Sequence, residues 1–266
     1  MPGRLARNWP LLGAMLKQQW LLLSRYPVNL IANFSLVLVG VVGLTVAVSL
    51  FAPAEAGAAL DFGRLALYGF AIYLFLSGSL WTIGLGVQRE RLQGTLESLY
   101  LSPAPRPLSL AARALLGWGW TAVAAAIGLG IAQAIIGRVP FHQPGLALLI
   151  LAGILGQFLG LGLVLAGLGL LLGESVELLS NLLEFGLLAL CAFFFPFSVL
   201  PAPVQVISRL IPLSYAVDAF RTALLGFPSG YPELGSFGVE LALVLAAGLL
   251  APVAGYGLYA LAERRL

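Results

Sequence analysis

Long uncharged apolar stretches alternate with short polar connections along this chain. An α-helix needs roughly 20 residues to cross about 30 Å of hydrocarbon, and six stretches reach that length. The sequence therefore predicts membrane spans over residues 26–54, 65–88, 114–137, 145–173 and 241–262, with a further span, the fifth in chain order, centred on 185–199. The stretches are apolar on all faces and lack the alternating polarity of membrane-barrel strands. The predicted fold class is all-α and polytopic.

Composition indicates that the solvent of most of the surface is a lipid bilayer. Hydrophobic residues make up 60% of the 266 residues and charged residues only 9%, against roughly 25% charged in a typical globular protein. The 14 basic and 11 acidic residues cannot cover a water-exposed domain of this size, and their small excess of +3 is too dispersed to predict nucleic-acid binding. The single cysteine, Cys191, excludes an internal disulfide and a thiolate metal cage.

Basic residues gather on one side of the predicted spans. With the N-terminus in the cytosol, ten of the 14 Lys and Arg residues fall on the inner side, and the outer side carries Arg64, Arg138, Arg209 and Arg221. This bias follows the enrichment of Lys and Arg in cytoplasmic loops. Both termini are therefore predicted to be cytosolic, which requires an even number of spans. The spans predict a multi-pass membrane protein. We expect the membrane to be a prokaryotic cell (inner) membrane, because 13 of the 14 basic residues are Arg, a bias that is typical of GC-rich prokaryotic genomes.

A seventh span over 205–226 is long enough but too polar. It contains Arg209, Asp218 and Arg221, and each charge near the bilayer centre costs roughly 2.5 to 3.5 kcal/mol. Pro212 would also interrupt the helix. The charges and the proline together argue against a crossing helix here.

We predict instead a re-entrant or interfacial helical hairpin on the outer face, over 200–236, with the chain turned by Pro201 and Pro203. Such a hairpin changes the chain direction without exposing unpaired backbone to lipid. Asp218 and Arg221 stand at i and i+3 in it, the spacing of a local ion pair.

Ahead of the first span, residues 10–25 are too few and too polar to cross the membrane. Apolar residues recur there at three- and four-residue spacing, and they are Leu12, Met15, Leu16, Trp20 and Leu23. This pattern predicts an amphipathic helix in the inner headgroup region. The helix either anchors the first span alone or also contacts a partner protein.

The connection between the second and third spans, residues 88–107, is the most charged passage of the chain. It retains an apolar side formed by Leu92, Leu96, Leu99 and Leu101. A short amphipathic helix parallel to the membrane fits this pattern, and prolines at 103, 105 and 107 end it. The alternative is a solvated loop that only obeys the positive-inside rule.

Two passages of sequence carry a family resemblance. Residues 89–97 read RERLQGTLE and are followed by Ser102, Pro103 and Arg106. Farther along, the chain reads NLL at 181–183, FPFSVLP at 195–201 and IPLSYAVDAFR at 211–221. In this order, and on the expected sides of the membrane, both passages resemble the ATP-binding-cassette (ABC) type-2 transporter permease family. With six spans and the N-terminal helix, the resemblance covers nearly the whole chain.

The resemblance implies a coupling helix in the first cytosolic loop that docks on an ATPase subunit. Carried over to this sequence, the docking residues are Arg89, Glu90, Arg91, Gly94, Thr95 and Glu97. The outer hairpin of the family corresponds here to Pro201, Pro212, Tyr215, Asp218 and Arg221. The resemblance also implies that 10–25 lies beside the same ATPase, and that two permeases, identical or different, form a dimer in the lipid membrane with two ATPase subunits.

The chain carries no phosphate-binding loop of its own. The pattern G-x-x-x-x-G-K-[ST] does not occur, and the only lysine is Lys17. ATP and Mg are therefore expected on the partner ATPase, and this chain is not expected to be an enzyme. The expected activity is export of a drug, lipid or glycoconjugate by alternating access. The alternative, an ion-gradient transporter or integral membrane enzyme, is weakened because the sequence offers no membrane-embedded His/Asp/Glu cluster and no inverted repeat.

Polar residues in the fifth span are the first candidates for a transport pathway. Glu177, Asn181 and Glu184 stand at i, i+4 and i+7, and the same helical face extends to Phe195 if the helix begins near Val176. That face would line the pathway, the dimer seam or an ATPase contact. If the helix begins near Asn181 instead, both carboxylates lie in the inner headgroup region.

Aromatic residues are concentrated at the outer end of the same span, at positions 193, 194, 195 and 197. An interfacial aromatic belt explains them, and a collar that gates a hydrophobic substrate is the alternative.

Overall fold

Helices account for all the regular structure in the described part of the chain. The structure is a computed structural model, and the residues it describes are 13, 17, 21, 25, 35, 39–43, 46, 56–86, 88, 106–137, 140–226, 228, 230, 231 and 234–264. Within these residues no strand is found. The all-α fold class is confirmed.

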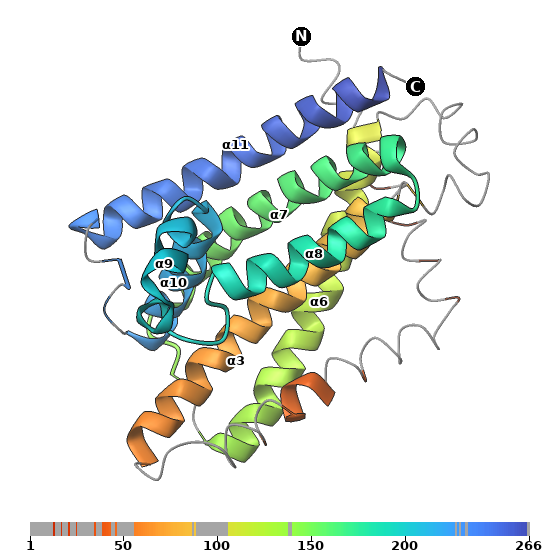
Figure 1. Cartoon of the computed structure of the whole chain (residues 1–266). Coiled ribbons are helices and arrows are strands. Elements are labelled where there is room, and N and C mark those ends of the chain that lie inside the picture. Colours follow the sequence, from red (N-terminus) through yellow and green to blue (C-terminus); the bar gives the residue numbers. More distant parts are fainter. Residues whose placement is uncertain are drawn as a thin grey trace.

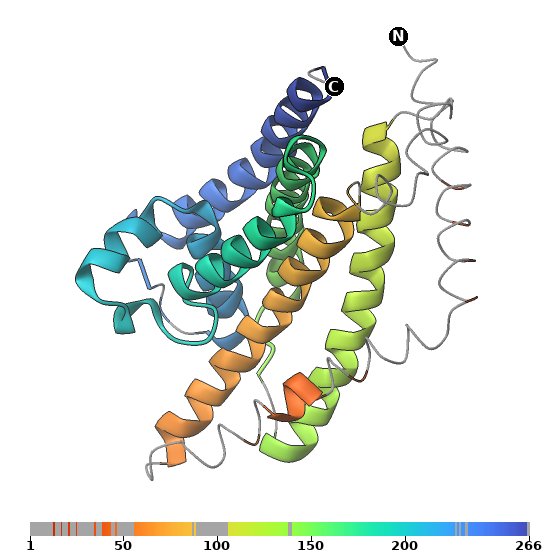
Figure 2. The same ribbon diagram turned by 45° about the vertical axis from the view of Figure 1, so that its right-hand side comes forward.

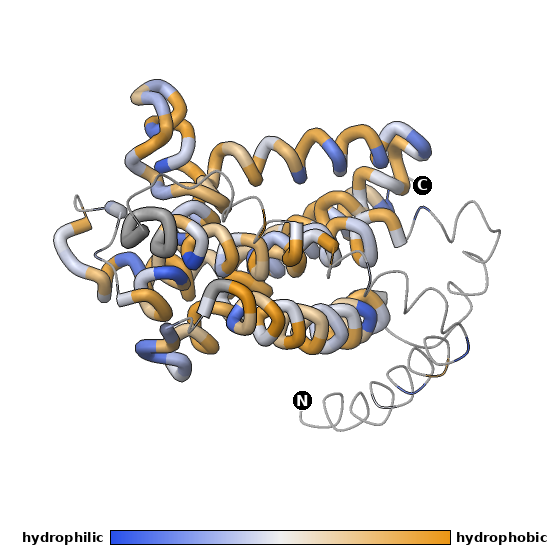
Figure 3. Tube along the Cα trace, turned by 90° about the horizontal axis from the view of Figure 1, so that it is seen from below, coloured by the Kyte–Doolittle hydropathy of each residue, from blue (hydrophilic) through white to orange (hydrophobic). Residues whose placement is uncertain are grey.

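Four of the described helices are long and apolar enough to cross a membrane. They are α3 (Ala56–Ser79), which continues into the π-helix η1 (Leu80–Gly84), and α6 (Arg106–Ile136), α7 (Pro144–Leu172) and α11 (Phe237–Glu263). Hydrophobic residues dominate the length of these helices in Figure 3. They confirm the predicted apolar helices at 65–88, 114–137, 145–173 and 241–262.

The long helices pack in the order α11, α7, α3, α6, as Figures 1 and 2 show. The shorter α8 (Ser175–Leu190) follows α7 after a tight turn and lies against α7, η1 and α3. The end of α11, the turn between α7 and α8 and the start of α6 lie at one end of the molecule, at the upper right of Figure 1. By the charge bias, this is the end predicted to face the cytosol.

Small residues let α7 and α11 approach closely along their length. A methyl group on Gly248 would lie 2.5 Å from the carbonyl oxygen of Gly153, and one on Gly156 would overlap the backbone of Gly248. In lipid, where apolar side chains gain little by leaving the solvent, such close backbone packing drives helix association. The α7–α11 pair is therefore the most tightly fitted helix pair in the described structure.

The predicted fifth span is not a continuous helix over 185–199. Its helix, α8, ends at Leu190 after 16 residues, which corresponds to about 24 Å at 1.5 Å per residue. Ala192 then adopts a positive φ of 50°, and only one short 3₁₀ turn, η2 (Phe197–Val199), follows. The helix begins at Ser175, so the alternative in which it begins near Asn181 is wrong.

Two short helices occupy the segment predicted as an outer hairpin. They are α9 (Ala202–Arg209) and α10 (Pro212–Leu225). Pro212 opens α10 and cannot continue a preceding helix, so residues 205–226 do not form one spanning helix. In Figure 1 both helices lie beside the start of α11, away from the predicted cytosolic end.

Three predictions fall mainly on residues that the structure does not describe. In the predicted interfacial helix 10–25, residues 13, 17, 21 and 25 are helical. In the predicted first span 26–54, residues 35, 39–43 and 46 are helical. The loop 88–107 is described only at Gln88 and at the start of α6. The count of six spans therefore stays a prediction.

Candidate functional site

The predicted ATPase-coupling loop is framed by described helices. The η1 helix ends at Gly84 and α6 begins at Arg106, close to the turn between α7 and α8 (Figure 1). The coupling residues themselves, Arg89, Glu90, Arg91, Gly94, Thr95 and Glu97, lie outside the described residues. Their docking role stays a prediction.

The predicted polar face of α8 runs from the surface into the protein. Glu177 is exposed and Asn181 is half-buried, with its Nδ2 donating to the Glu177 carbonyl at 3.1 Å. Glu184, two turns into the helix, is only 4% exposed. Phe195 lies beyond the end of α8, so the expectation that it extends this helical face is wrong. Glu184 is the one member of the predicted set that reaches the interior.

Aromatic side chains of the α3–η1 helix hold the Glu184 carboxylate. The indole Nε1 of Trp81 donates to Glu184 Oε2 at 3.0 Å, and the Tyr73 hydroxyl is also hydrogen-bonded to this carboxylate. Both groups are neutral. Among the residues that the structure describes, no Lys or Arg pairs with Glu184. The site is therefore a buried carboxylate that is hydrogen-bonded to two neutral aromatic side chains, Trp81 and Tyr73.

The π-helix η1 places Trp81 in this contact. A π-turn adds a residue to the helical repeat and shifts the side chains that follow it, and such turns occur frequently at functional sites. Trp81 is the second residue of η1. On the other side of the helix, Ser79 accepts a hydrogen bond at 2.7 Å from the Trp118 indole of α6. Polar contacts therefore tie this turn to both neighbouring helices.

Three aromatic rings form a cluster that Tyr73 connects to the carboxylate. The ring of Tyr73 lies 5.9 Å from that of Phe70 and 6.1 Å from that of Phe194, and the latter two are 6.3 Å apart between centroids. All three side chains are half-buried. Tyr73 joins the two features, since its ring belongs to the aromatic triangle and its hydroxyl to the Glu184 carboxylate.

A second buried charge, Arg221 of α10, holds the chain that follows α8. Its Nη1 donates to the Phe195 carbonyl at 3.1 Å, and its Nη2 donates to the carbonyls of Ala192 and Phe193. Burial lowers the pKa of Arg221 to about 10, and the nearby Asp218 carboxylate opposes that shift. Since a pKa of about 10 leaves the group protonated at neutral pH, the guanidinium is a permanent donor to the broken end of the helix.

Helix α3 meets this junction at Gly69. A side-chain carbon at Gly69 would overlap the carbonyl oxygen of Phe193 and lie 3.0 Å from Arg221 Nη2. The glycine therefore permits direct contact between α3 and the backbone after α8. Helix α3, the segment after α8 and helix α10 therefore meet at this junction, although they are distant in sequence.

The remaining predicted hairpin residues also hold the hairpin together. Pro201 precedes α9 and Pro212 opens α10. The Tyr215 hydroxyl donates to the Arg209 carbonyl at 2.8 Å, and the Asp218 carboxylate accepts from the Gly230 amide at 2.6 Å. At the other end of α10, the amides of 142 and 143 donate to the carbonyls of 224 and 223, each at 3.0 Å. These bonds satisfy carbonyl groups that a helix end leaves free.

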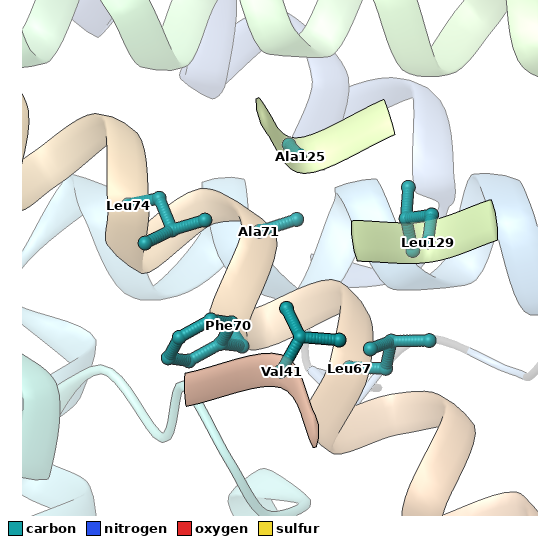
Figure 4. A pocket seen from close by; sticks show the side chains of 7 residues that line it. All are labelled: Val41, Leu67, Phe70, Ala71, Leu74, Ala125 and Leu129. Atoms are coloured by element: carbon teal, nitrogen blue, oxygen red, sulfur yellow. The ribbon is translucent and has the colours of Figure 1, made fainter. Parts of the chain in front are cut away.

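An apolar pocket lies between α3 and α6, and neither Glu184 nor Arg221 lines it. Figure 4 shows its lining, formed by Val41, Leu67, Phe70, Ala71, Leu74, Ala125 and Leu129. It offers no polar group for chemistry. Phe70 is shared between this pocket and the aromatic triangle.

Sequence reasoning missed the residues of α3 that complete the site. Phe70, Tyr73 and Ser77 of α3 and Trp81 of η1 recur at spacings of three and four, which places them on one helical face, and the Ser77 hydroxyl is hydrogen-bonded to Tyr73. This stripe of aromatic and hydroxyl groups is a signal that could have been found. The role of Gly69 could not, because nothing in the sequence pairs it with residue 193.

A comparison with protein-family models found one match. The model, described as ABC-2 type transporter, matches residues 10–225. The matched range includes the predicted interfacial helix, the predicted coupling loop, α8 and the predicted outer hairpin as far as the end of α10. No curated protein matches the chain.

Proposed function

The chain belongs to the ABC-2 type transporter family, and we propose that it is the permease subunit of an exporter driven by a separate ATPase. As an ABC-2 membrane domain it is a transport permease and not itself a catalytic unit. The observation that carries the proposal is the match over residues 10–225, combined with apolar helices of spanning length. ATP and Mg bind to the partner subunit, because this chain has one lysine and no phosphate-binding loop.

In the proposed topology six helices cross the membrane and both termini are cytosolic. The loop 88–107 docks on the ATPase through Arg89, Glu90, Arg91, Gly94, Thr95 and Glu97. Support for this orientation comes from the ten-to-four bias of basic residues. The turn between α7 and α8 and the end of α11 lie at the same end of the molecule as the start of α6, which directly follows this loop in the sequence (Figure 1).

The hairpin α9–α10 enters the outer leaflet without crossing it. Its charges argue against a crossing, and its hydrogen bonds to the α6–α7 connection support a position at the outer side. The working unit is a dimer of permeases in a prokaryotic cell membrane. The transported compound is an amphiphile of the drug, lipid or glycoconjugate class, moved outward by alternating access.

Coupling can be tested by charge reversal in the loop. The full chain is co-expressed with its candidate ATPase, and co-purification and ATPase activity are measured for Arg89→Glu, Glu90→Lys and Glu97→Lys. We expect each to lower co-purification and transport-coupled hydrolysis by about tenfold, because buried interfacial charges lose partners. Arg64→Glu, a charge reversal near the opposite end of α3, is the matched control and should retain both.

The outcome also separates the proposal from its alternative. If no ATPase co-purifies and the reconstituted chain transports in ATP-free vesicles loaded with an ion gradient, the chain is a gradient-driven transporter. Equal losses in Arg64→Glu and in the loop variants would indicate damage to folding and contradict a docking role for the loop.

A further inference from the structure

The Glu184 site combines an anionic charge with open aromatic surface. The carboxylate is 4% exposed and lies on α8, inside the helical body of the protein. A carboxylate buried in this way is costly unless a cation or a proton neutralises it. In the described part of the chain its hydrogen-bond partners are neutral. No described side chain therefore neutralises the negative charge of the Glu184 carboxylate.

The aromatic cluster that Tyr73 connects to Glu184 defines what kind of cation fits. Phe70, Tyr73 and Phe194 form a triangle with centroids 5.9 to 6.3 Å apart, and each ring is half-buried. A cation held within about 6 Å of an aromatic face is attracted by the ring quadrupole. An inorganic ion such as Ca²⁺ would need six or more oxygen ligands, and the described side chains of this group offer the carboxylate and the hydroxyls of Tyr73 and Ser77. The three aromatic rings and the Glu184 carboxylate together suit an organic cation, in which the positive charge is attached to an apolar body.

We propose that the junction of α3 and α8 binds an organic cation, with Glu184 as the counter-charge and Phe70, Tyr73 and Phe194 as the aromatic surface. The inference rests on the proposed function, since it names the substrate class of the exporter. The hydroxyl of Tyr73 and the indole of Trp81 position the carboxylate. Transported compounds of this class are lipophilic amines and quaternary ammonium or phosphonium ions.

The test measures binding to the purified full chain in detergent, without an ATPase. The probe is radiolabelled tetraphenylphosphonium, and neutral triphenylphosphine oxide is the competitor that has aromatic bulk but no charge. We expect saturable binding that the neutral compound does not displace. Glu184→Gln should weaken it by about tenfold or more, since a desolvated charge pair is lost.

Glu177→Gln is the matched control, because it makes the same change on the exposed part of the same helix. It should alter the affinity by less than about twofold, since an exposed charge is screened by solvent. Glu184→Asp retains the charge and should retain part of the binding. Equal affinity in the Glu184→Gln and Glu177→Gln variants, or displacement by the neutral compound, would overturn the proposal; the carboxyl would then be a protonated structural group.

A second pair of variants covers the case in which Glu184→Gln does not fold. Phe194→Leu leaves the carboxylate and its donors in place and removes one ring of the triangle, so affinity should fall by about fivefold. Phe185→Leu, at an exposed phenylalanine on α8, should leave it unchanged. Equal effects in these two variants would count against the aromatic surface.

The binding test and the coupling test fail independently. If tetraphenylphosphonium binds through Glu184 but no ATPase co-purifies, the cation site stands and the ATP-driven mechanism is wrong. If an ATPase couples to the chain but tetraphenylphosphonium binds equally to the wild type and to Glu184→Gln, the exporter stands and its proposed substrate class is wrong.

Discussion

Two buried charges of opposite sign organise different parts of this protein. Arg221 is 3% exposed and Glu184 is 4% exposed, so both have left water. The guanidinium donates to three backbone carbonyls of one chain segment. The carboxylate accepts from the side chains of two aromatic residues on a neighbouring helix. Arg221 and Glu184 are equally buried, but Arg221 is hydrogen-bonded to backbone groups and Glu184 to side chains.

The kind of partner decides what each charge can do. Arg221 donates to the backbone carbonyls of Ala192, Phe193 and Phe195, so it is part of the fold of that segment. The donors to Glu184 are neutral side chains, so a bound cation would be the counter-charge of the carboxylate that they position. We therefore assign Arg221 to the stability of the outer junction and Glu184 to transport.

The largest expected effect is on stability, from Arg221→Met. This change removes the donor to three buried carbonyls and should lower the free energy of unfolding by about 3 to 5 kcal/mol. Unfolding of the purified chain in detergent micelles, followed by denaturant titration, measures it. Arg209→Met, at an exposed arginine of α9 that lies over the Phe197 ring, should cost only about 1 kcal/mol. Similar losses at both positions would remove the distinction between the buried and the exposed arginine.

Gly69→Ala should have the next largest effect. The new methyl group would meet the Phe193 carbonyl and separate α3 from the Arg221 junction, which should cost about 2 to 3 kcal/mol. Gly78→Ala, on the same helix, is the matched control, because its methyl group would lie 3.5 Å from Thr121 Oγ1, an ordinary contact. A tolerated alanine at 69 would show that α3 is not held at the junction.

Hydropathy predicted the long helices well but could not show where α8 ends. The bounds of α7 and α11 lie within four residues of the predicted runs 145–173 and 241–262, whereas α3 and α6 begin nine and eight residues before the predicted runs because both extend into charged sequence. The run around 185–199 is just as apolar, yet the helix stops at Leu190. Arg221, about 30 residues farther along the chain, donates to three backbone carbonyls of the segment after the break. Local sequence carries no sign of such a partner.

The candidate site was half predictable for a similar reason. Glu184 and Arg221 stand out as charges in apolar surroundings. Trp81 and Tyr73 stand out only through the three- and four-residue spacing of their stripe, since single aromatic residues are common in membrane helices, and the π-turn at Leu80–Gly84 that shifts Trp81 has no sequence signature. Which helix faces Glu184 depends on tertiary packing.

A pair of tryptophan substitutions tests whether Glu184 is ionised. Trp81→Phe removes a donor to the carboxylate, and Trp118→Phe removes a donor to the neutral Ser79 hydroxyl. Hydrogen bonds to charged groups contribute about 1.5 to 3 kcal/mol and neutral ones about 0.5 to 1.5. Trp81→Phe should therefore destabilise the chain by about 1 kcal/mol more than Trp118→Phe. Equal losses would mean that the carboxyl is neutral.

Glu184→Gln should have the smallest effect on stability and a large effect on transport. The amide oxygen of Gln still accepts from Trp81, and an uncompensated buried charge disappears, so the free energy of unfolding should stay within about 1 kcal/mol of wild type. Export of tetraphenylphosphonium and its stimulation of ATPase activity, measured in proteoliposomes with the partner ATPase, should be lost. Arg221→Lys should have the opposite effects, a loss of stability without a loss of export. Lysine retains the charge but cannot donate to three carbonyls at once, so the free energy of unfolding should fall, whereas the protein that remains folded should still export tetraphenylphosphonium. If Glu184→Gln exports normally, or destabilises as much as Arg221→Met, then Glu184 is as structural as Arg221, and the two buried charges do not divide stability from transport.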